Sequence, residues 1–183
     1  SHYGHTKCDA ENYIKSFING IIFRLATVFG ISPRMRLDLL VNEFVYKALT
    51  DRYLVLFERK AIRNYIHIQD IANVFSFMID NYEKCQGEIY NVGLSDANLS
   101  KQELVDKIQE YIGEFVVSHS EYYEDPDKRN YIVSNEKIES TGWKPQYSLD
   151  DGIQELVNGY KIIVNNDSSH FRNAFPLGYG KLF

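Results

Sequence analysis

Apolar residues recur along the chain at two spacings, and each spacing predicts a different kind of element. Residues 21–28 (Ile-Ile-Phe-Arg-Leu-Ala-Thr-Val) form a nearly continuous apolar run, which is typical of a strand buried on both faces of a parallel sheet. Residues 53–57 and 88–92 predict further strands, with shorter ones around 65–67 and 115–117. Strands that alternate with helical segments in this way indicate an α/β fold.

Apolar residues at helical spacing predict two helices between these strands. One apolar stripe runs from Leu37 to Leu49, and a second lies in residues 70–83. We expect both stripes to be buried in the core. The second stripe comprises Ile71, Val74, Phe75, Met78, Ile79 and Tyr82.

Local capping signals mark two more helices. Ser100 and Glu103 form a capping box, in which each residue satisfies a backbone N–H near the other, and it opens a helix with an apolar face. Ser148 and Asp151 form a second such box and predict a helix over 149–164.

The first residues carry a candidate acid–base pair. Residues 3–18 predict a helix that ends at Asn19-Gly20, so Tyr3 and Lys7 stand four residues apart on one face. A cation close to a phenol favours the phenolate, which makes tyrosine more useful in acid–base chemistry, and lysine keeps donors for a second partner. With fourteen tyrosines in the chain, the spacing alone also fits a solvated helix face.

The motifs around this pair follow a known order. Residues 3–7 (Tyr-Gly-His-Thr-Lys) precede a strand that ends in 23–30 (Phe-Arg-Leu-Ala-Thr-Val-Phe-Gly). Residues 63–72 (Arg-Asn-Tyr-Ile-His-Ile-Gln-Asp-Ile-Ala), 90–93 (Tyr-Asn-Val-Gly) and 142–145 (Gly-Trp-Lys-Pro) come after them. From residue 1 to about residue 160 the chain resembles the extended short-chain dehydrogenase/reductases, the NAD-dependent epimerases and dehydratases that act on nucleotide sugars.

The resemblance implies a domain organisation. Residues 1–30 would be a remnant of the Rossmann-type NAD-binding domain, and 31–183 mainly a smaller α/β substrate-binding domain, with 65–95 returning to the Rossmann sheet. The sequence contains no G-x-G-x-x-G turn for a cofactor pyrophosphate. We therefore expect the C-terminal part of a longer protein, inactive by itself, that forms a homodimer when intact.

The resemblance also implies roles for residues near the cofactor. Tyr3 would be the general acid/base and a cofactor contact, and Lys7 would tune it and hold the nicotinamide ribose. Leu25 would touch the nicotinamide through its backbone. Thr27 stands where the family usually has Asn and would face the substrate. For Leu25 and Thr27, packing of the strand against the sheet is the alternative.

Three further residues would bind the nucleotide sugar. Arg63 matches a residue that grips the diphosphate, which suits a planar guanidinium, although a surface ion pair is the alternative. Arg129 resembles a second nucleotide contact, but Asp125 and Asp127 make an ion pair equally reasonable. Asn42 interrupts an apolar helix and could reach the nucleotide.

Composition and charge exclude several other classes. The formal net charge of −5 argues against a general nucleic-acid binder, and no apolar run approaches the ~20 residues of a membrane span. Cys8 and Cys85 are the only cysteines, which indicates reduced thiols and a cytoplasmic protein. His67 and Asp70 are too few ligands for a closed metal site, so we expect no metal and a structural His67.

Two functions remain open from the sequence. The first is an NAD(P)-dependent nucleotide-sugar epimerase or dehydratase, in which hydride transfer to NAD or NADP accompanies proton removal by Tyr3. The second is a non-catalytic binding or structural domain derived from such an enzyme. Because strand 21–28 would lack part of its cover, we also expect the isolated chain to self-associate or to rearrange its first thirty residues, and to bind NAD poorly.

Overall fold

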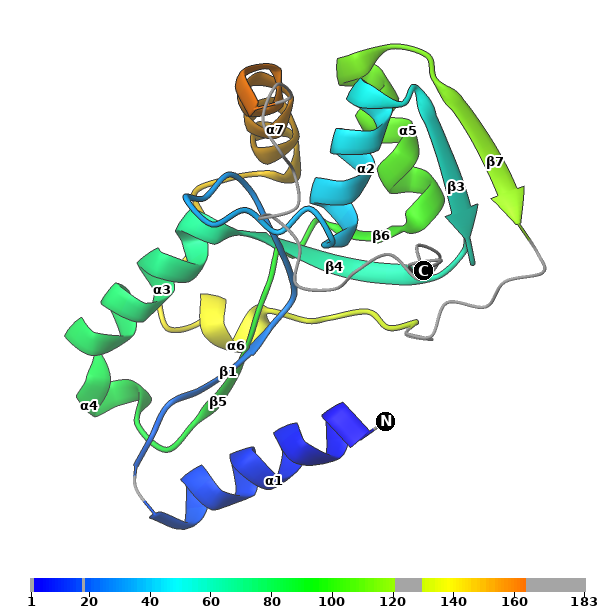
Figure 1. Ribbon diagram of the computed structural model, residues 1–183. Helices are drawn as coiled ribbons and strands as arrows, with labels where there is room; N and C mark the ends of the chain where they lie inside the picture. Colours follow the sequence, from blue (N-terminus) through cyan, green and yellow to red (C-terminus); the bar gives the residue numbers. More distant parts are fainter. Residues whose placement is uncertain (1, 18, 121–129, 164–183) are drawn as a thin grey trace, which may run out of the picture.

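The computed structural model describes residues 2–17, 19–120 and 130–163, which form a mixed α/β architecture with three small sheets (Figure 1). The strands are β1 (Ile22–Leu25), β2 (Thr27–Phe29), β3 (Tyr53–Phe57), β4 (Ile62–His67), β5 (Ile89–Val92), β6 (Asn98–Ser100) and β7 (Val116–Ser120). The helices are α1 (His2–Phe17), α2 (Leu40–Thr50), α3 (Ile68–Asp80), α4 (Tyr82–Cys85), α5 (Lys101–Ile112), α6 (Glu136–Glu139) and α7 (Leu149–Ile163). The α/β class predicted from the sequence is confirmed.

Parallel pairing dominates the sheets. β1 pairs with β5, β2 with β4, and β3 with β7, all in parallel, while β6 runs antiparallel to the first half of β4. Helices α2, α5 and α7 pack against one another in the upper part of Figure 1, and their apolar faces supply much of the core. None of the helices in the described ranges is long and apolar enough to cross a membrane.

The predicted strand 21–28 is divided into two segments. β1 ends at Leu25, the Ala26 N–H donates to the Val92 carbonyl at 2.9 Å, and β2 begins at Thr27. The single continuous strand was therefore a wrong prediction, because the first segment pairs with β5 and the second with β4. A hydrophobic run in the sequence cannot show where a strand changes its neighbour.

Both capping boxes are present, as the sequence predicted. The Ser100 hydroxyl accepts from the Glu103 N–H, and the Glu103 carboxylate accepts from the Ser100 N–H at 2.7 Å. The Ser148 and Asp151 groups make the same pair of bonds at the start of α7. Each carboxylate also accepts from the serine hydroxyl, at 2.7 Å from Ser100 and 2.6 Å from Ser148. This hydroxyl bond, and after it the backbone N–H bond, lowers the pKa of both carboxyl groups.

The apolar stripe of residues 70–83 is only partly buried. α3 ends at Asp80, and Phe75 and Ile79 remain 50% and 74% exposed. The prediction of a fully buried stripe was wrong, because α3 packs on the core through Ile71, Val74 and Met78 and turns Phe75 and Ile79 to solvent. Phe75 meets the ring of Phe23 edge-on, with the ring centroids 5.0 Å apart. Leu25, two residues after Phe23 on β1, is also exposed.

We predict that this exposed apolar face makes the 183-residue chain self-associate in solution. Phe75 and Ile79 lie four positions apart on one face of α3, and exposed apolar side chains of this kind are often covered by association. Light scattering coupled to size-exclusion chromatography should report species larger than a monomer, and Phe75→Glu with Ile79→Lys should reduce them. Ile162→Lys, at an isoleucine that is 79% exposed on α7, is the matched control and should change nothing. A monomeric wild-type chain would contradict the prediction.

A buried aspartate joins α3 to the loop before α7. The Asp70 carboxylate, in the first turn of α3, accepts from the Gln146 N–H at 2.8 Å and from the Tyr147 N–H at 3.1 Å. Asp70→Ala should lower the free energy of unfolding by about 2–4 kcal/mol, because two charge-assisted hydrogen bonds are lost. Urea titration of this variant and of Asp80→Ala, an exposed aspartate on the same helix, measures the effect. Equal losses in the two variants would contradict it.

Candidate functional site

Helix α1 places the predicted acid–base pair side by side. The Lys7 ammonium nitrogen lies 5.3 Å from the centroid of the Tyr3 ring, and the Tyr3 side chain is 60% exposed. The two groups therefore share a face of the helix, as the i, i+4 spacing predicted. An exposed phenol beside a cation can exchange a proton with a bound molecule, and the ammonium has donors left for a hydroxyl.

Helix α1 is attached to the rest of the molecule through a polar contact. The Glu11 carboxylate accepts from Arg24 of β1 in a two-pronged ion pair, at 2.8 and 2.7 Å. The guanidinium lowers the pKa of the Glu11 carboxyl group. The other side chains of α1 from His2 to Ser16 are exposed. The Arg24 side chain is exposed, so solvent screens this ion pair and its contribution to stability is small.

Buried tyrosines elsewhere are poorly suited to proton transfer. Burial raises the pKa of the phenols of Tyr65 and Tyr160, and it raises that of Tyr90 to about 12. These groups stay protonated near neutral pH and cannot act as bases. Tyr3 differs from all three because it is exposed and has a lysine on the same helix face.

The chain changes its strand partner at Ala26, between the predicted cofactor contact Leu25 and the predicted substrate contact Thr27. Parallel strands β1 and β5 end together at Leu25 and Val92, and β2 continues beside β4 from Thr27. In open α/β sheets, ligands bind at the carboxyl ends of the strands where the strand order switches. Leu25 is 43% exposed, so it is not a residue buried by packing of the strand against the sheet. Thr27 is half-buried and lies opposite Tyr65 of β4.

Arg63 is buried on β4 and not on the surface. Its residue is 5% exposed, its Nη1 donates to the Ile62 carbonyl at 3.1 Å, and the guanidinium carbon lies 5.8 Å from the ring centroid of Tyr131. The alternative of a surface ion pair therefore does not describe this residue. Its contact with a diphosphate stays a prediction.

The remaining predicted nucleotide contacts have different outcomes. Asn42 is buried, and its amide oxygen accepts from the Gly30 N–H while its amide nitrogen donates to the Arg36 carbonyl, both at 3.1 Å. This side chain joins the loop after β2 to α2, and its contact with a nucleotide stays a prediction. Arg129, with the neighbouring acidic residues, lies outside the described residues.

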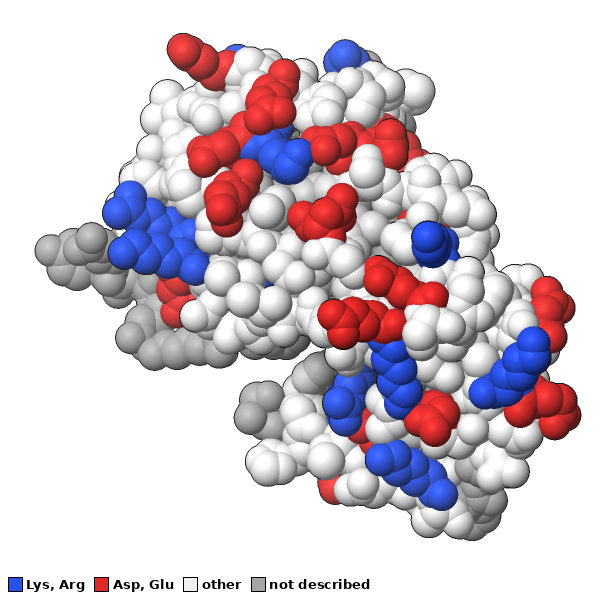
Figure 2. All heavy atoms as spheres, turned by 180° about the vertical axis from the view of Figure 1, so that it is seen from behind, with Lys and Arg blue, Asp and Glu red and all other residues white. Residues whose placement is uncertain are grey.

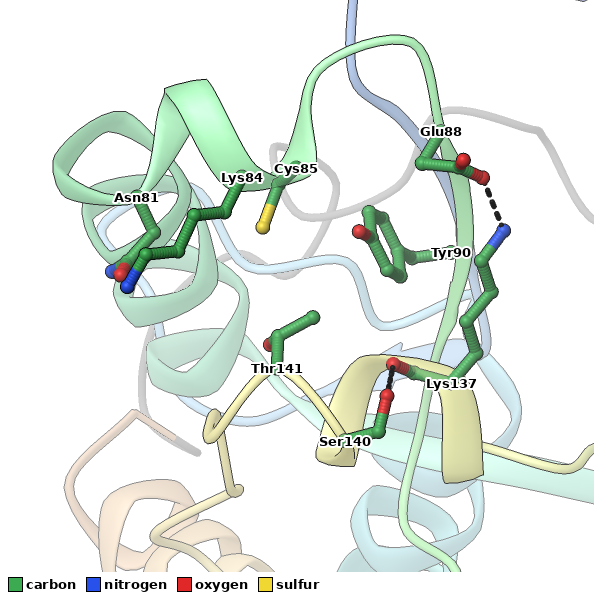
Figure 3. Close-up of a pocket in the computed structure, with 8 residues that line it drawn as sticks. All are labelled: Asn81, Lys84, Cys85, Glu88, Tyr90, Lys137, Ser140 and Thr141. Atoms are coloured by element: carbon green, nitrogen blue, oxygen red, sulfur yellow. Dashed lines mark hydrogen bonds and ion pairs between the residues drawn. The ribbon is translucent and has the colours of Figure 1, made fainter.

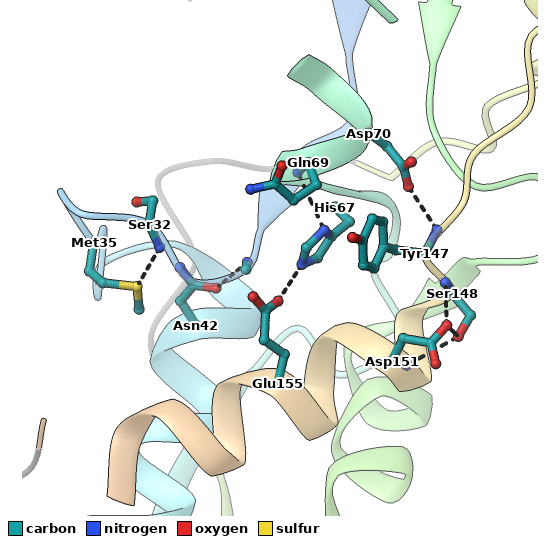
Figure 4. A network of polar contacts seen from close by, with 11 residues as sticks. Ser32, Met35, Asn42, His67, Gln69, Asp70, Tyr147, Ser148, Asp151 and Glu155 are labelled. Atoms are coloured by element: carbon teal, nitrogen blue, oxygen red, sulfur yellow. Dashed lines mark hydrogen bonds and ion pairs between the residues drawn. The ribbon is translucent and has the colours of Figure 1, made fainter. Parts of the chain in front are cut away.

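A buried histidine closes the carboxyl end of β4, as expected for a structural His67. Its Nδ1 accepts from the Gln69 N–H at 3.3 Å and so caps α3, which leaves Nε2 to donate to the Glu155 carboxylate at 2.5 Å (Figure 4). The ring stacks on Tyr147 with the centroids 4.5 Å apart. The sequence did not identify Glu155, because nothing local in α7 signals a partner 88 residues away.

Glycines allow the strands and α7 to approach this histidine. A Cβ at Gly30, whose φ is +120°, would lie 2.6 Å from His67 Nε2. A Cβ at Gly152 would lie 2.2 Å from the Phe29 ring. Both positions therefore require glycine, and the loop that leaves β2 is held directly against His67.

Tyr90 also has a lysine over its ring, with the Lys137 ammonium 5.2 Å from the ring centroid, but this phenol is buried. Within the described ranges, no three His, Cys, Asp or Glu side chains are placed to hold a metal ion. A pocket of about 430 Å³ between α4, β5 and α6 (Figure 3) is lined by two lysines, Lys84 and Lys137, and Lys137 donates to the Glu88 carboxylate at 2.7 Å. On the face in Figure 2, basic side chains stand among acidic ones, unlike the single-sign surface of a general nucleic-acid binder.

Comparison with known proteins identifies relatives along most of the chain. Residues 1–93 match the model of the "NAD dependent epimerase/dehydratase family". The low-salt glycan biosynthesis protein Agl12 of Haloferax volcanii is 28% identical over 170 residues, which cover 86% of this chain and 52% of that protein. The dTDP-D-glucose 4,6-dehydratase of Mus musculus is 27% identical over 177 residues, or 90% of this chain and 48% of the relative.

Solved structures show the same fold. The structure of UDP-glucose 4-epimerase of Thermotoga maritima with UDP-glucose matches this chain with a TM-score of 0.73 at 23% identity. The match covers 88% of this chain and 54% of the epimerase chain. The dTDP-glucose 4,6-dehydratase of Bacillus anthracis in complex with NAD has a TM-score of 0.71 at 23% identity, and the match covers 87% of this chain and 50% of the dehydratase chain. This chain spans about half the length of the curated relatives that it matches.

Proposed function

The chain belongs to the NAD-dependent epimerase/dehydratase family, and from this premise we propose that the intact protein is an NAD(P)-dependent enzyme that modifies a nucleotide-diphosphate sugar. The observation that carries the proposal is the Tyr3–Lys7 pair, with the ammonium 5.3 Å from the phenol ring. The T. maritima and mouse relatives are named for UDP-glucose and dTDP-glucose, and we assign this chain the same class of substrate.

In the proposed reaction Tyr3 handles the proton of a sugar hydroxyl. Its phenolate accepts that proton as the alcohol becomes a ketone, and returns it when the ketone is reduced or rearranged. The dinucleotide, when bound, supplies the acceptor for the hydride that leaves the same carbon. Lys7 favours the phenolate by its charge and donates to a ribose hydroxyl.

The residues present fit the nicotinamide end of the cofactor. Lys7 is exposed and offers ammonium donors, and the exposed Leu25 ends β1 at the carboxyl end of the parallel β1–β5 pair. The sequence holds no Gly-rich turn for the pyrophosphate, so this chain accounts for one end of the cofactor. We propose that 1–30 and 65–95 belong to the cofactor-binding domain and most of 31–183 to the substrate domain.

Mass spectrometry of the intact protein under native conditions tests the proposal. We expect retained NAD or NADP, or its binding on addition, together with conversion of UDP-glucose, dTDP-glucose or a related nucleotide sugar. Binding of both ligands without any conversion would support a non-catalytic domain derived from such an enzyme. Failure to bind either dinucleotide would contradict the proposed function.

A further inference from the structure

Side-chain amides hold the extended segment before α6, residues 130–133, which we call the strap. The Val133 N–H donates to Asn98 Oδ1 at 2.9 Å, and Asn98 Nδ2 donates to the Val133 carbonyl at 3.0 Å. The amide of Asn98 therefore takes the place of a neighbouring strand. Among the described residues the strap belongs to no β-strand, so this pair of bonds replaces a backbone ladder.

The other end of the strap is tied to the start of β4. The Ile62 N–H donates to Asn130 Oδ1 at 3.0 Å, and the Tyr131 N–H donates to the Ile62 carbonyl at 3.5 Å. Asn98 itself lies on β6, opposite Asn64 of β4. The strap therefore runs alongside β4 (Figure 1) and is fixed at both ends to the same pair of strands.

The strap carries Tyr131 to Arg63. The guanidinium carbon lies 5.8 Å from the Tyr131 ring centroid, within the distance at which a cation is attracted to an aromatic face. Arg63 also donates to the Ile62 carbonyl, so a backbone group and the strap ring both restrict the guanidinium. A guanidinium binds a diphosphate through a planar fork, and the orientation of that plane decides whether two oxygens can be bound together.

We infer that Asn98 is a positioning residue for the nucleotide-sugar site: by holding Val133 it keeps Tyr131 against Arg63 and so fixes the plane of the guanidinium. The inference rests on the proposed function and on the role predicted for Arg63 from the sequence, which is to hold the diphosphate of the nucleotide sugar. Without the Asn98 amide, the strap loses the two bonds that fix its end, and the Tyr131 ring can leave the guanidinium. The affinity for the diphosphate should then fall, while the affinity for the nucleoside should not change.

A double-mutant cycle on the intact protein tests this. Calorimetry measures the affinity for UDP and dTDP, and for uridine and thymidine as ligands without a diphosphate. Asn98→Leu should weaken diphosphate binding about tenfold, a typical coupling for residues in one contact network, and leave nucleoside binding unchanged. In the Arg63→Ala background the same substitution should have no further effect. Asn158→Leu, an exposed asparagine of α7, is the matched control.

Two results would overturn the inference while the proposed function stands. In the first, Asn98→Leu weakens nucleoside and diphosphate binding equally. In the second, Asn98→Leu weakens diphosphate binding as much in the Arg63→Ala background as in wild type. If Arg63→Ala itself leaves diphosphate binding intact, the role of Arg63 fails and the inference with it. If Asn98→Leu does not fold, two other variants replace it. Asn98→Asp keeps the acceptor for the Val133 N–H and should lose less affinity for the diphosphate. Tyr131→Leu should lose diphosphate affinity and keep nucleoside affinity. Unchanged diphosphate affinity in Tyr131→Leu would refute the inference.

Discussion

Tyr3→Phe should lower the turnover of the intact protein by about 10²–10⁴-fold, the usual contribution of a general acid–base group. The substitution removes one hydroxyl from a side chain that is 60% exposed, so the fold has little to lose. The remaining phenyl ring keeps its place next to Lys7, which means that binding of the dinucleotide should change little. Steady-state kinetics and a cofactor titration on the same preparation separate the two effects.

Tyr13→Phe is the matched control for this prediction. Tyr13 lies on the same helix and is 64% exposed, but the residue four positions later is Phe17 and not a lysine. The Tyr13→Phe variant should convert the substrate at the wild-type rate. A Tyr3→Phe enzyme as active as Tyr13→Phe would remove the assignment of Tyr3 as the acid–base group.

Arg63→Ala should weaken binding of the nucleoside diphosphate by about 30-fold or more while binding of NAD stays nearly unchanged. Truncating a buried, hydrogen-bonded charge that pairs with a ligand typically costs 2–5 kcal/mol. The dinucleotide is assigned to Tyr3, Lys7 and the end of β1, which are different elements from β4. Calorimetric titration of both ligands measures the difference.

Because Arg63 is 5% exposed, its loss could also loosen the fold, and the controls address this. Arg63→Lys keeps the charge but not the planar fork, and it should bind the diphosphate less well than wild type. Arg59→Ala, at an exposed arginine in the loop before β4, should bind both ligands normally. Equal losses of NAD and diphosphate affinity in Arg63→Ala would indicate general destabilisation and contradict the assigned role.

The features that the sequence predicted well are those with local causes. The start of α5 at Ser100–Glu103 and that of α7 at Ser148–Asp151 depend on residues three positions apart, and both are found. The Tyr3–Lys7 contact is equally local, since one turn of helix produces it. Motif order then placed these elements within a family, which no local rule could have done.

The features that the sequence did not predict depend on neighbours distant in the chain. Strand 21–28 divides at Ala26 because β5 and β4, which lie far along the chain, pair with its two halves. The stripe of α3 leaves Phe75 and Ile79 exposed, because the helix packs on the core through Ile71, Val74 and Met78 instead. Arg63 is buried partly because the Tyr131 ring, 68 positions later in the sequence, lies over it.

Following a labelled hydrogen tests most directly whether Tyr3 removes the proton that accompanies hydride transfer to NAD. The intact protein, loaded with NAD and in excess, is mixed with UDP-glucose or dTDP-glucose whose sugar is fully deuterated, and the reaction is quenched in acid within one turnover. We expect deuterium on the reduced nicotinamide in wild type and in Tyr13→Phe, and almost none in Tyr3→Phe. Product formed at the wild-type rate without deuterium ever reaching the cofactor would contradict it.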